Sequence, residues 1–102
     1  MPENMPKGIE EDIPTGIRIF ERKHMLAILF FVHSRGGCTR MELYNGVANN
    51  DRMPDKLGVL EEAGLITQHI DRNTRAVRIE MTDVGMEAMG HLLEVDRLIE
   101  QP

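Results

Sequence analysis

Aromatic residues and cysteine are scarce in this chain, which has no Trp, one Tyr and one Cys. With so few aromatic rings, the chain has few side chains that could stack on unpaired bases, which disfavours a protein that binds single-stranded nucleic acid. The lone thiol, Cys38, excludes a disulfide within the chain. It could be a redox sensor, but a small buried residue is favoured, because reactivity needs an exposed, electropositive site.

Long hydrophobic runs are also lacking. The longest apolar run, Met25 to Val32, is far shorter than the roughly 20 residues of a membrane-spanning helix. The N-terminus shows no basic-then-apolar signal pattern. We therefore expect a cytoplasmic protein with no membrane partner. A length of 102 residues suits one domain.

Residue patterns for catalysis or metal binding are absent from the sequence. The four histidines lack metal-ligand spacing, and only Cys38 could join them. No nucleophile–base pair, phosphate-cradling glycine loop or paired-carboxylate spacing stands out. We predict that the protein is not an enzyme and holds no metal or cofactor.

Acidic charge, with a net value of −5, is concentrated at the two ends. Residues 1–16 carry one Lys against four acids, and residues 83–102 carry one Arg against five. Residues 17–82 carry ten Lys or Arg against eight acids. The middle is therefore weakly basic, which permits nucleic acid as a partner without requiring it.

The first half of the chain predicts an extended arm and three helices. Residues 1–16 hold three of the five prolines, which oppose a helix. A buried helix, apolar on every side, is predicted from about Ile17 or Phe20 to Arg35, ended by Gly36 and Gly37. A capping box of Thr39 and Glu42 starts a second helix, about 40–48. Its predicted inward residues are Met41, Leu43 or Tyr44, and Val47.

A third helix, about 51–63, is predicted from Pro54 in its first turn and from apolar spacing. Its predicted core residues are Met53, Leu57 and Leu60. The side chains of Asn49, Asn50 and Asp51 can cap it.

Two strands and a last helix follow. Ile66, Gln68 and Ile70 alternate with polar residues, and Val77, Ile79 and Met81 do the same after the polar turn "DRNTR", 71–75. Thr82 then caps a helix of about Asp83 to Ile99. This order predicts an α+β, mostly helical fold, a winged helix-turn-helix of three helices, a two-stranded wing and a C-terminal helix. Its body is 17–82, and 83–102 is the C-terminal helix.

Two motifs resemble winged helix-turn-helix transcription regulators. "LGVLEEAGLI", 57–66, is similar to the end of their recognition helix, and "VRIEMTDVG", 77–85, to their last wing strand and closing-helix start. The resemblance covers about residues 20–99 and is closest to small MarR-like and HxlR-like regulators of bacteria and archaea. It implies a homodimeric repressor or activator that binds double-stranded DNA.

The resemblance also implies positions for DNA contacts, with the third helix in the major groove. The groove-facing residues would be Asn50, Asp51, Arg52, Asp55 and Lys56. Arg52 could bond guanine and Asn50 adenine. However, Asp51, Asp55, Gly58 and Glu62 form one acidic row opposite the core stripe. A winged-helix protein-interaction module of a transcription assembly, with no DNA site of its own, therefore stays open as the alternative.

The predicted wing, 71–78, is more basic than the third helix. It carries Arg72, Asn73, Arg75 and Arg78, which suit phosphate or minor-groove contacts. Arg40, at the start of the second helix, could add a backbone contact. The alternative is a solvated hairpin whose charges protect its edges from pairing.

The last helix carries two apolar surfaces. One stripe consists of Val84, Ala88, Leu92, Val95 and Ile99, and a separate patch consists of Met86, Met89 and Leu93. A helix packing on its own domain needs one stripe, so we predict that the patch is a homodimer interface. The alternative is that the first helix and the arm cover both surfaces.

Overall fold

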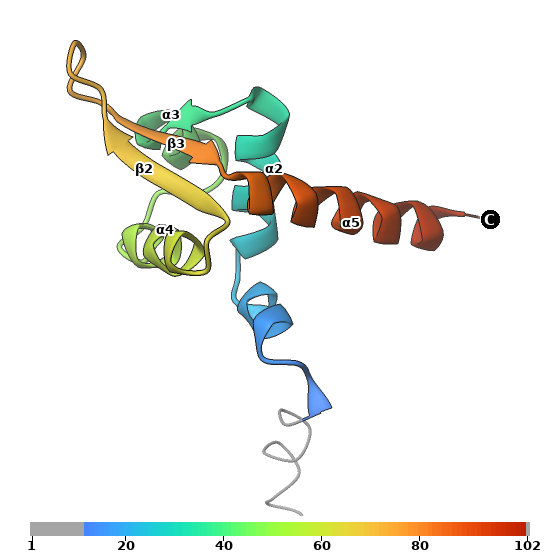
Figure 1. Ribbon diagram of the computed structural model, residues 1–102. Helices are drawn as coiled ribbons and strands as arrows, with labels where there is room; N and C mark the ends of the chain where they lie inside the picture. Colours follow the sequence, from blue (N-terminus) through green and yellow to red (C-terminus); the bar gives the residue numbers. More distant parts are fainter. Residues whose placement is uncertain (1–11, 102) are drawn as a thin grey trace, which may run out of the picture.

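The computed structural model describes residues 12–101, which form an α+β fold that is mostly helical and contains a small antiparallel sheet (Figure 1). This confirms the α+β, mostly helical part of the predicted fold class. The arm expected over residues 1–16 lies largely outside the described residues. The elements are η2 (Gly16–Glu21), α2 (Met25–Arg35), β1 (Cys38–Thr39), α3 (Arg40–Gly46), α4 (Met53–Glu62), β2 (Ile66–Ile70), β3 (Val77–Met81) and α5 (Asp83–Glu100).

Helix α2 supplies the centre of the core, but it begins later than predicted. Its buried residues are Met25, Ile28, Leu29 and Val32. A 3-10 turn, η2, precedes it, and His24 between them has a φ of 75°. A left-handed residue cannot continue a right-handed helix, so the helix expected from Ile17 or Phe20 starts only at Met25. The prediction that every side is buried was also wrong, since Leu26 is 39% exposed.

The loop after α2 leads into β1 and α3. Thr39 and Glu42 form the predicted capping box, with Thr39 Oγ1 accepting from the Glu42 amide and Glu42 Oε1 accepting from the Thr39 amide. Leu43 is fully buried, whereas Met41, predicted to face inward, is 69% exposed. A ring of Phe31 lies so close to Gly46 that a Cβ there would sit 2.2 Å from Phe31 Cε1. A side chain at residue 46 would therefore force the Phe31 ring to move, and the glycine accommodates the close approach of α2 and α3.

Helix α4 agrees with the predicted position of the third helix. Pro54 lies in its first turn, and Met53, Leu57 and Leu60 are fully buried, as predicted. The expected side-chain cap was wrong, because the N-cap residue is Arg52 and makes no side-chain cap hydrogen bond. Asn50 Oδ1 instead accepts from the Arg52 amide at 2.9 Å and shapes the turn that leads into the helix.

The sheet has the strand order β1-β3-β2, and β2 and β3 form the predicted antiparallel hairpin. Its register pairs Ile66 with Met81 and Ile70 with Val77. Ile66 and Ile79 are buried, while Ile70 is 64% exposed, because the hairpin leaves the body toward its turn (Figure 1). The two-residue strand β1 was not predicted; it pairs Cys38 with Ile79.

Helix α5 begins where the hairpin ends, and it projects from the body on the side away from the hairpin (Figure 1). Thr82 caps it as predicted, accepting from the Gly85 amide at 2.9 Å. Thr82 Oγ1 also donates to the Gly64 carbonyl at 2.6 Å, and the Thr82 amide donates to the Leu65 carbonyl at 3.1 Å. Among residues 12–101, no helix is both long and apolar enough to cross a membrane.

The two apolar surfaces of α5 differ from the prediction. Met89, assigned to the dimer patch, is fully buried in the protein's own core, so it is not available to a partner. Met86 and Leu93 of that patch are 51% and 44% exposed. Three residues of the stripe expected to pack internally are at least as exposed, namely Val84, Val95 and Ile99 at 60%, 51% and 75%. Val95 and Ile99 are exposed because the C-terminal part of α5 extends past the body (Figure 1), whereas Ala88 and Leu92 of the same stripe pack against the core.

Gly85 is required by the close approach of α5 to the chain after α4. A Cβ at residue 85 would lie 2.1 Å from the Leu65 carbonyl oxygen, a backbone atom that cannot rotate away. We expect Gly85→Ala to lower the free energy of unfolding by about 1–3 kcal/mol, as overpacking does. Chemical denaturation monitored by circular dichroism measures this change.

Gly90→Ala is the matched control in the same helix, because a Cβ at residue 90 would meet no atom within 4 Å. Removing a glycine from a helix interior should raise the free energy of unfolding by up to about 1 kcal/mol. Equal effects of the two substitutions would contradict the close contact at Gly85.

Candidate nucleic-acid interface

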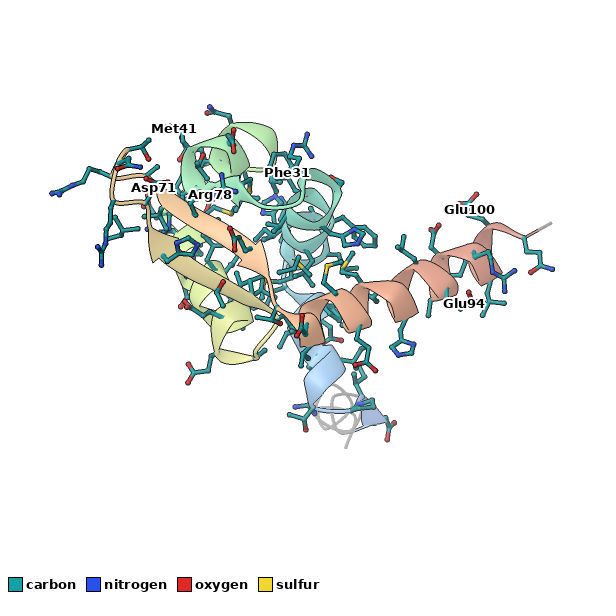
Figure 2. The ribbon with its side chains drawn as sticks, turned by 45° about the horizontal axis from the view of Figure 1, so that its top comes forward. Phe31, Met41, Asp71, Arg78, Glu94 and Glu100 are labelled. Atoms are coloured by element: carbon teal, nitrogen blue, oxygen red, sulfur yellow. The ribbon has the colours of Figure 1, made fainter. Side chains whose placement is uncertain are left out.

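The turn of the β2–β3 hairpin is organised by Asp71. Its Oδ1 accepts from the amides of Asn73 and Thr74 at 2.8 and 3.0 Å. Backbone hydrogen bonds close the loop, from the Arg75 amide to the Asp71 carbonyl and from the Asp71 amide to the Ala76 carbonyl. The hydrogen bonds from the Thr74 and Asn73 amides hold the pKa of the Asp71 carboxyl below its ordinary value. A small polar segment is thereby given a defined shape at the far end of the hairpin (Figure 2).

The predicted wing residues occupy two different places. Arg72, Asn73 and Arg75 are exposed in the turn, and within residues 12–101 no carboxylate pairs with either arginine. Arg78 lies nearer the body, on β3 opposite His69 and Thr39. Its guanidinium is 3.9 Å from Glu80, and its Nη2 would be 3.1 Å from a Cβ at Gly37. The free cations of the hairpin are therefore those of the turn.

A chain of polar contacts joins α3, β2 and α4. Arg40 donates from Nε and Nη2 to Gln68 Oε1 at 3.0 and 2.8 Å. Gln68 Nε2 in turn donates to Glu61 Oε1 at 2.9 Å. Arg40, predicted as a phosphate contact, is thus occupied in holding the hairpin base against two helices. Sequence reasoning missed this chain of contacts, because its members are far apart in sequence and ordinary in type.

The start of α4 differs from the predicted groove-facing arrangement. Lys56 is only 6% exposed, and its Nζ lies 3.3 Å from His24 Nδ1, so it does not face a groove. Helical spacing put Lys56 on the flank of the core stripe, and the segment before α2 covers that flank. Asn50 Oδ1 accepts from the Arg52 amide, so this side chain is engaged within its own turn. Arg52 is exposed, in agreement with its predicted accessibility.

The acidic row on α4 is partly neutralised. Asp55 accepts from Arg22 Nη2 at 3.0 Å, which ties α4 to the segment before α2. Glu61, which lies outside this row, accepts a hydrogen bond from the uncharged Gln68 side chain. Asp51 and Glu62 remain exposed, and α4, which lies wholly within the described residues, has no exposed cation. The outer face of α4 therefore offers little positive charge beyond Arg52 at its entrance.

Cys38 and the histidines add no reactive centre to this surface. Cys38 is 1% exposed, and burial followed by the charge of Glu42 raises its pKa, so the thiol stays protonated at neutral pH. Across residues 12–101, no three His, Cys, Asp or Glu side chains are grouped so that they could hold a metal ion.

Comparison with known proteins gives no further guide to this surface. No protein-family model matches the chain, and no match was found among the curated proteins or the solved structures.

The Asp71 turn should be sensitive to substitution and to acid. We expect Asp71→Ala to speed amide exchange at Asn73 and Thr74 while the helical core keeps its protection, because only the turn loses its acceptor. Since the pKa of Asp71 is lowered in the folded state, its contribution is present above about pH 4 and is lost as the pH falls through that lowered value. Hydrogen exchange followed by NMR at several pH values checks both effects.

Asp96→Ala is the control, because Asp96 is exposed on α5. It should leave exchange in the hairpin unchanged. Exchange at Asn73 and Thr74 that did not respond to Asp71→Ala would contradict the assigned turn.

Proposed function

We propose that this protein is a DNA-binding transcriptional regulator of the winged helix-turn-helix type, acting in the cytoplasm. Helices α2, α3 and α4 correspond to the three helices, the β2–β3 hairpin to the wing and α5 to the C-terminal helix. In this proposal α4 enters the major groove, and the wing contacts the DNA backbone or the minor groove.

The observation that carries the proposal is where the unpaired cations lie. In the described part of the chain, Arg72 and Arg75 in the wing, and Lys23 and Arg52 beside the start of α4, have no carboxylate partner. Arg22, Arg78 and Arg97, by contrast, each lie near a carboxylate. The hairpin and α4 lie on the side of the molecule away from the free end of α5 (Figure 1). Arg35, at the C-terminal end of α2, also has no carboxylate partner within the described residues, but its guanidinium stacks on Phe31. The two groups of unpaired cations, in the hairpin turn and beside the start of α4, suit a phosphate backbone.

The acidic net charge does not oppose this proposal. Helix α5 carries much of the acid, and Glu94 and Glu100 lie at the opposite end of the molecule from Asp71 in the hairpin turn (Figure 2). Exposed charges separated by more than about 10 Å are largely screened at 0.1 M salt. The acidic residues of α5 therefore add little repulsion toward DNA phosphates that approach the hairpin.

The same charges predict that phosphate contacts dominate DNA binding. The wing supplies two free cations, whereas at the entrance to α4 Arg52 is exposed and Lys56 is buried. Phosphate contacts provide affinity with little sequence information, and base contacts provide discrimination. We therefore expect a strong salt dependence, with Arg52 as the main candidate for reading a base.

Removing the two wing cations tests the proposal. Arg75 has a φ of 66°, so Arg75→Gly removes its charge and also suits the left-handed backbone. We expect Arg72→Ala combined with Arg75→Gly to weaken binding to every duplex. The slope of log affinity against log salt should fall by roughly 2, since each phosphate contact contributes about 0.9. Fluorescence anisotropy at several salt concentrations measures both quantities.

Arg97→Ala is the matched control, because it removes one cation that is paired with Glu94 on α5. It should leave the slope unchanged. A wild-type protein with no measurable affinity for duplex DNA at low salt would reject the proposal and favour the protein-interaction module. Unchanged binding by the double variant would reject only the wing assignment.

We also propose that the protein is a homodimer, paired through an apolar face of α5 different from the predicted patch. Leu92, Val95 and Ile99 line a groove of about 190 Å³ together with Leu26 and Phe30 of α2. A second copy suits this face, because a two-fold axis would place the same projecting stripe of each chain against the other. Two wings and two α4 helices could then contact successive half-sites.

Val95→Glu should produce folded monomers. Val95 is 51% exposed, so a carboxylate there is solvated in a monomer, whereas in the dimer it would be buried next to a like charge. Met41→Glu, at a 69% exposed apolar position on α3, is the control and should keep the dimer. Light scattering with thermal melting distinguishes the species. A wild-type protein that is monomeric at high micromolar concentration would exclude the dimer.

A further inference from the structure

A basic pocket lies where the segment before α2 meets the turn that leads into α4. Its volume is about 600 Å³, and its lining consists of Lys23, His24, Asn49, Asn50, Asp51, Arg52 and Lys56. Lys23 and His24 come from one side, and the other residues come from the turn and first part of α4. The lining holds two lysines and one arginine against one carboxylate, so basic side chains outnumber acidic ones in the pocket.

Lys56 is the unusual member of this lining. It is the buried charged residue of the described chain, at 6% exposure, and no carboxylate within residues 12–101 pairs with it. Its one hydrogen bond runs from Nζ to His24 Nδ1 at 3.3 Å. An ammonium can only donate, so Nδ1 is the acceptor and the neutral ring carries its proton on Nε2. A buried cation with a neutral partner lacks a counter-ion.

A neighbouring cation that does not line the pocket is paired with a carboxylate. Arg22, next to Lys23 in sequence, bonds Asp55 at 3.0 Å. Within the described residues, Lys23 and Arg52 have no such partner, although both line the pocket with Lys56. Asp55, the acidic residue in the first turn of α4, is therefore paired with Arg22 and does not line the pocket. Basic side chains thus outnumber the one carboxylate in the lining, that of Asp51.

Two further features favour an anion here. The pocket lies at the N-terminal end of α4, where the helix dipole adds positive potential. His24 has a φ of 75°, an unfavourable conformation for a residue other than glycine. Backbone strain of this kind occurs frequently at binding sites.

We propose that this pocket binds a phosphate-type oxyanion, with Lys56, Lys23 and Arg52 supplying charge and hydrogen bonds and His24 Nε2–H as a further donor. A tetrahedral oxyanion has several acceptor oxygens, which matches a lining rich in donors. Its source is either free phosphate, including a phosphorylated small molecule, or a phosphate of the DNA backbone. The pocket is formed by this chain alone, so the proposal stands independently of DNA binding.

His24 provides the readout. Burial, then the charge of Lys56 and then that of Lys23, lowers the pKa of His24. The other charged residues that line the pocket are Asp51 and Arg52. A bound dianion would offset the lysines and raise the pKa of His24. The imidazole signal of His24 therefore reports occupancy directly.

The experiment is an NMR titration of the full chain with inorganic phosphate at constant ionic strength, followed at the His24 ring. We expect a saturable shift and a higher His24 pKa in the wild type. Lys56→Met should abolish the saturable shift. It should keep the fold, because an apolar chain of similar size replaces a buried charge. Lys23→Gln, at an exposed position, should weaken the response by at least several-fold without affecting the core.

Arg35→Gln is the matched control, because Arg35 ends α2 at the opposite end from His24 and its guanidinium stacks on Phe31. It should titrate like the wild type. A second titration uses a DNA duplex in place of phosphate. A His24 shift with the duplex alone, lost in Lys56→Met, would identify the backbone as the source. A linear, unsaturable response to phosphate together with no His24 response to the duplex would overturn the proposal.

The same titrations distinguish failure of the proposed DNA-binding function from failure of the proposed oxyanion site. A protein that binds no DNA but shows saturable phosphate binding lost in Lys56→Met keeps the oxyanion site and loses the regulator assignment. A protein that binds DNA through its wing but shows no response at His24 in either titration keeps the regulator assignment and loses the oxyanion site.

Discussion

The hydroxyl of Thr82 joins three parts of the chain, and the arrangement of the β2–β3 hairpin, α4 and α5 depends on it. It donates to the carbonyl of Gly64 after α4 and accepts from the amide of Gly85 in the first turn of α5. The Thr82 amide, at the end of the hairpin, donates to the Leu65 carbonyl. Because Gly85 has no side chain, α5 can pass directly over Leu65. This contact sets the direction in which α5 leaves the body, away from the hairpin.

Pairing of charges, more than their number, distinguishes the surfaces of this protein. Arg22 neutralises Asp55, and Gln68 engages both Arg40 and Glu61. These contacts hold the hairpin base and the segment before α2 against α4. They also leave the cations of the hairpin turn and of the basic pocket without carboxylate partners in the described chain. A protein with a net charge of −5 can therefore still carry cations without carboxylate partners at the hairpin turn and at the start of α4.

Local chemistry made much of the fold predictable. The capping box of Thr39 and Glu42, the cap at Thr82 and the polar turn after Ile70 each act within a few residues, so the sequence identifies them. The core positions Met53, Leu57 and Leu60 were likewise predicted from helical spacing. Strand β1 was missed, because two residues carry no recognisable periodicity and are ordered by pairing with β3. The late start of α2 was missed because the left-handed backbone at His24 has no sequence signal of its own.

The sequence by itself determined the order of the longer helices and the β2–β3 hairpin, the caps at Thr39 and Thr82, the core stripe of α4 and the basic composition of the hairpin turn, since all of these depend on near neighbours in the chain. Only the tertiary structure decided which side chains are available. In the folded chain Lys56 is buried against His24, and Met89 is buried in the core. Val95 and Ile99 are exposed, because the end of α5 extends past the rest of the domain (Figure 1). Exposure depends on which distant segment packs on each face of a helix, and helical periodicity defines the faces without saying which will be covered.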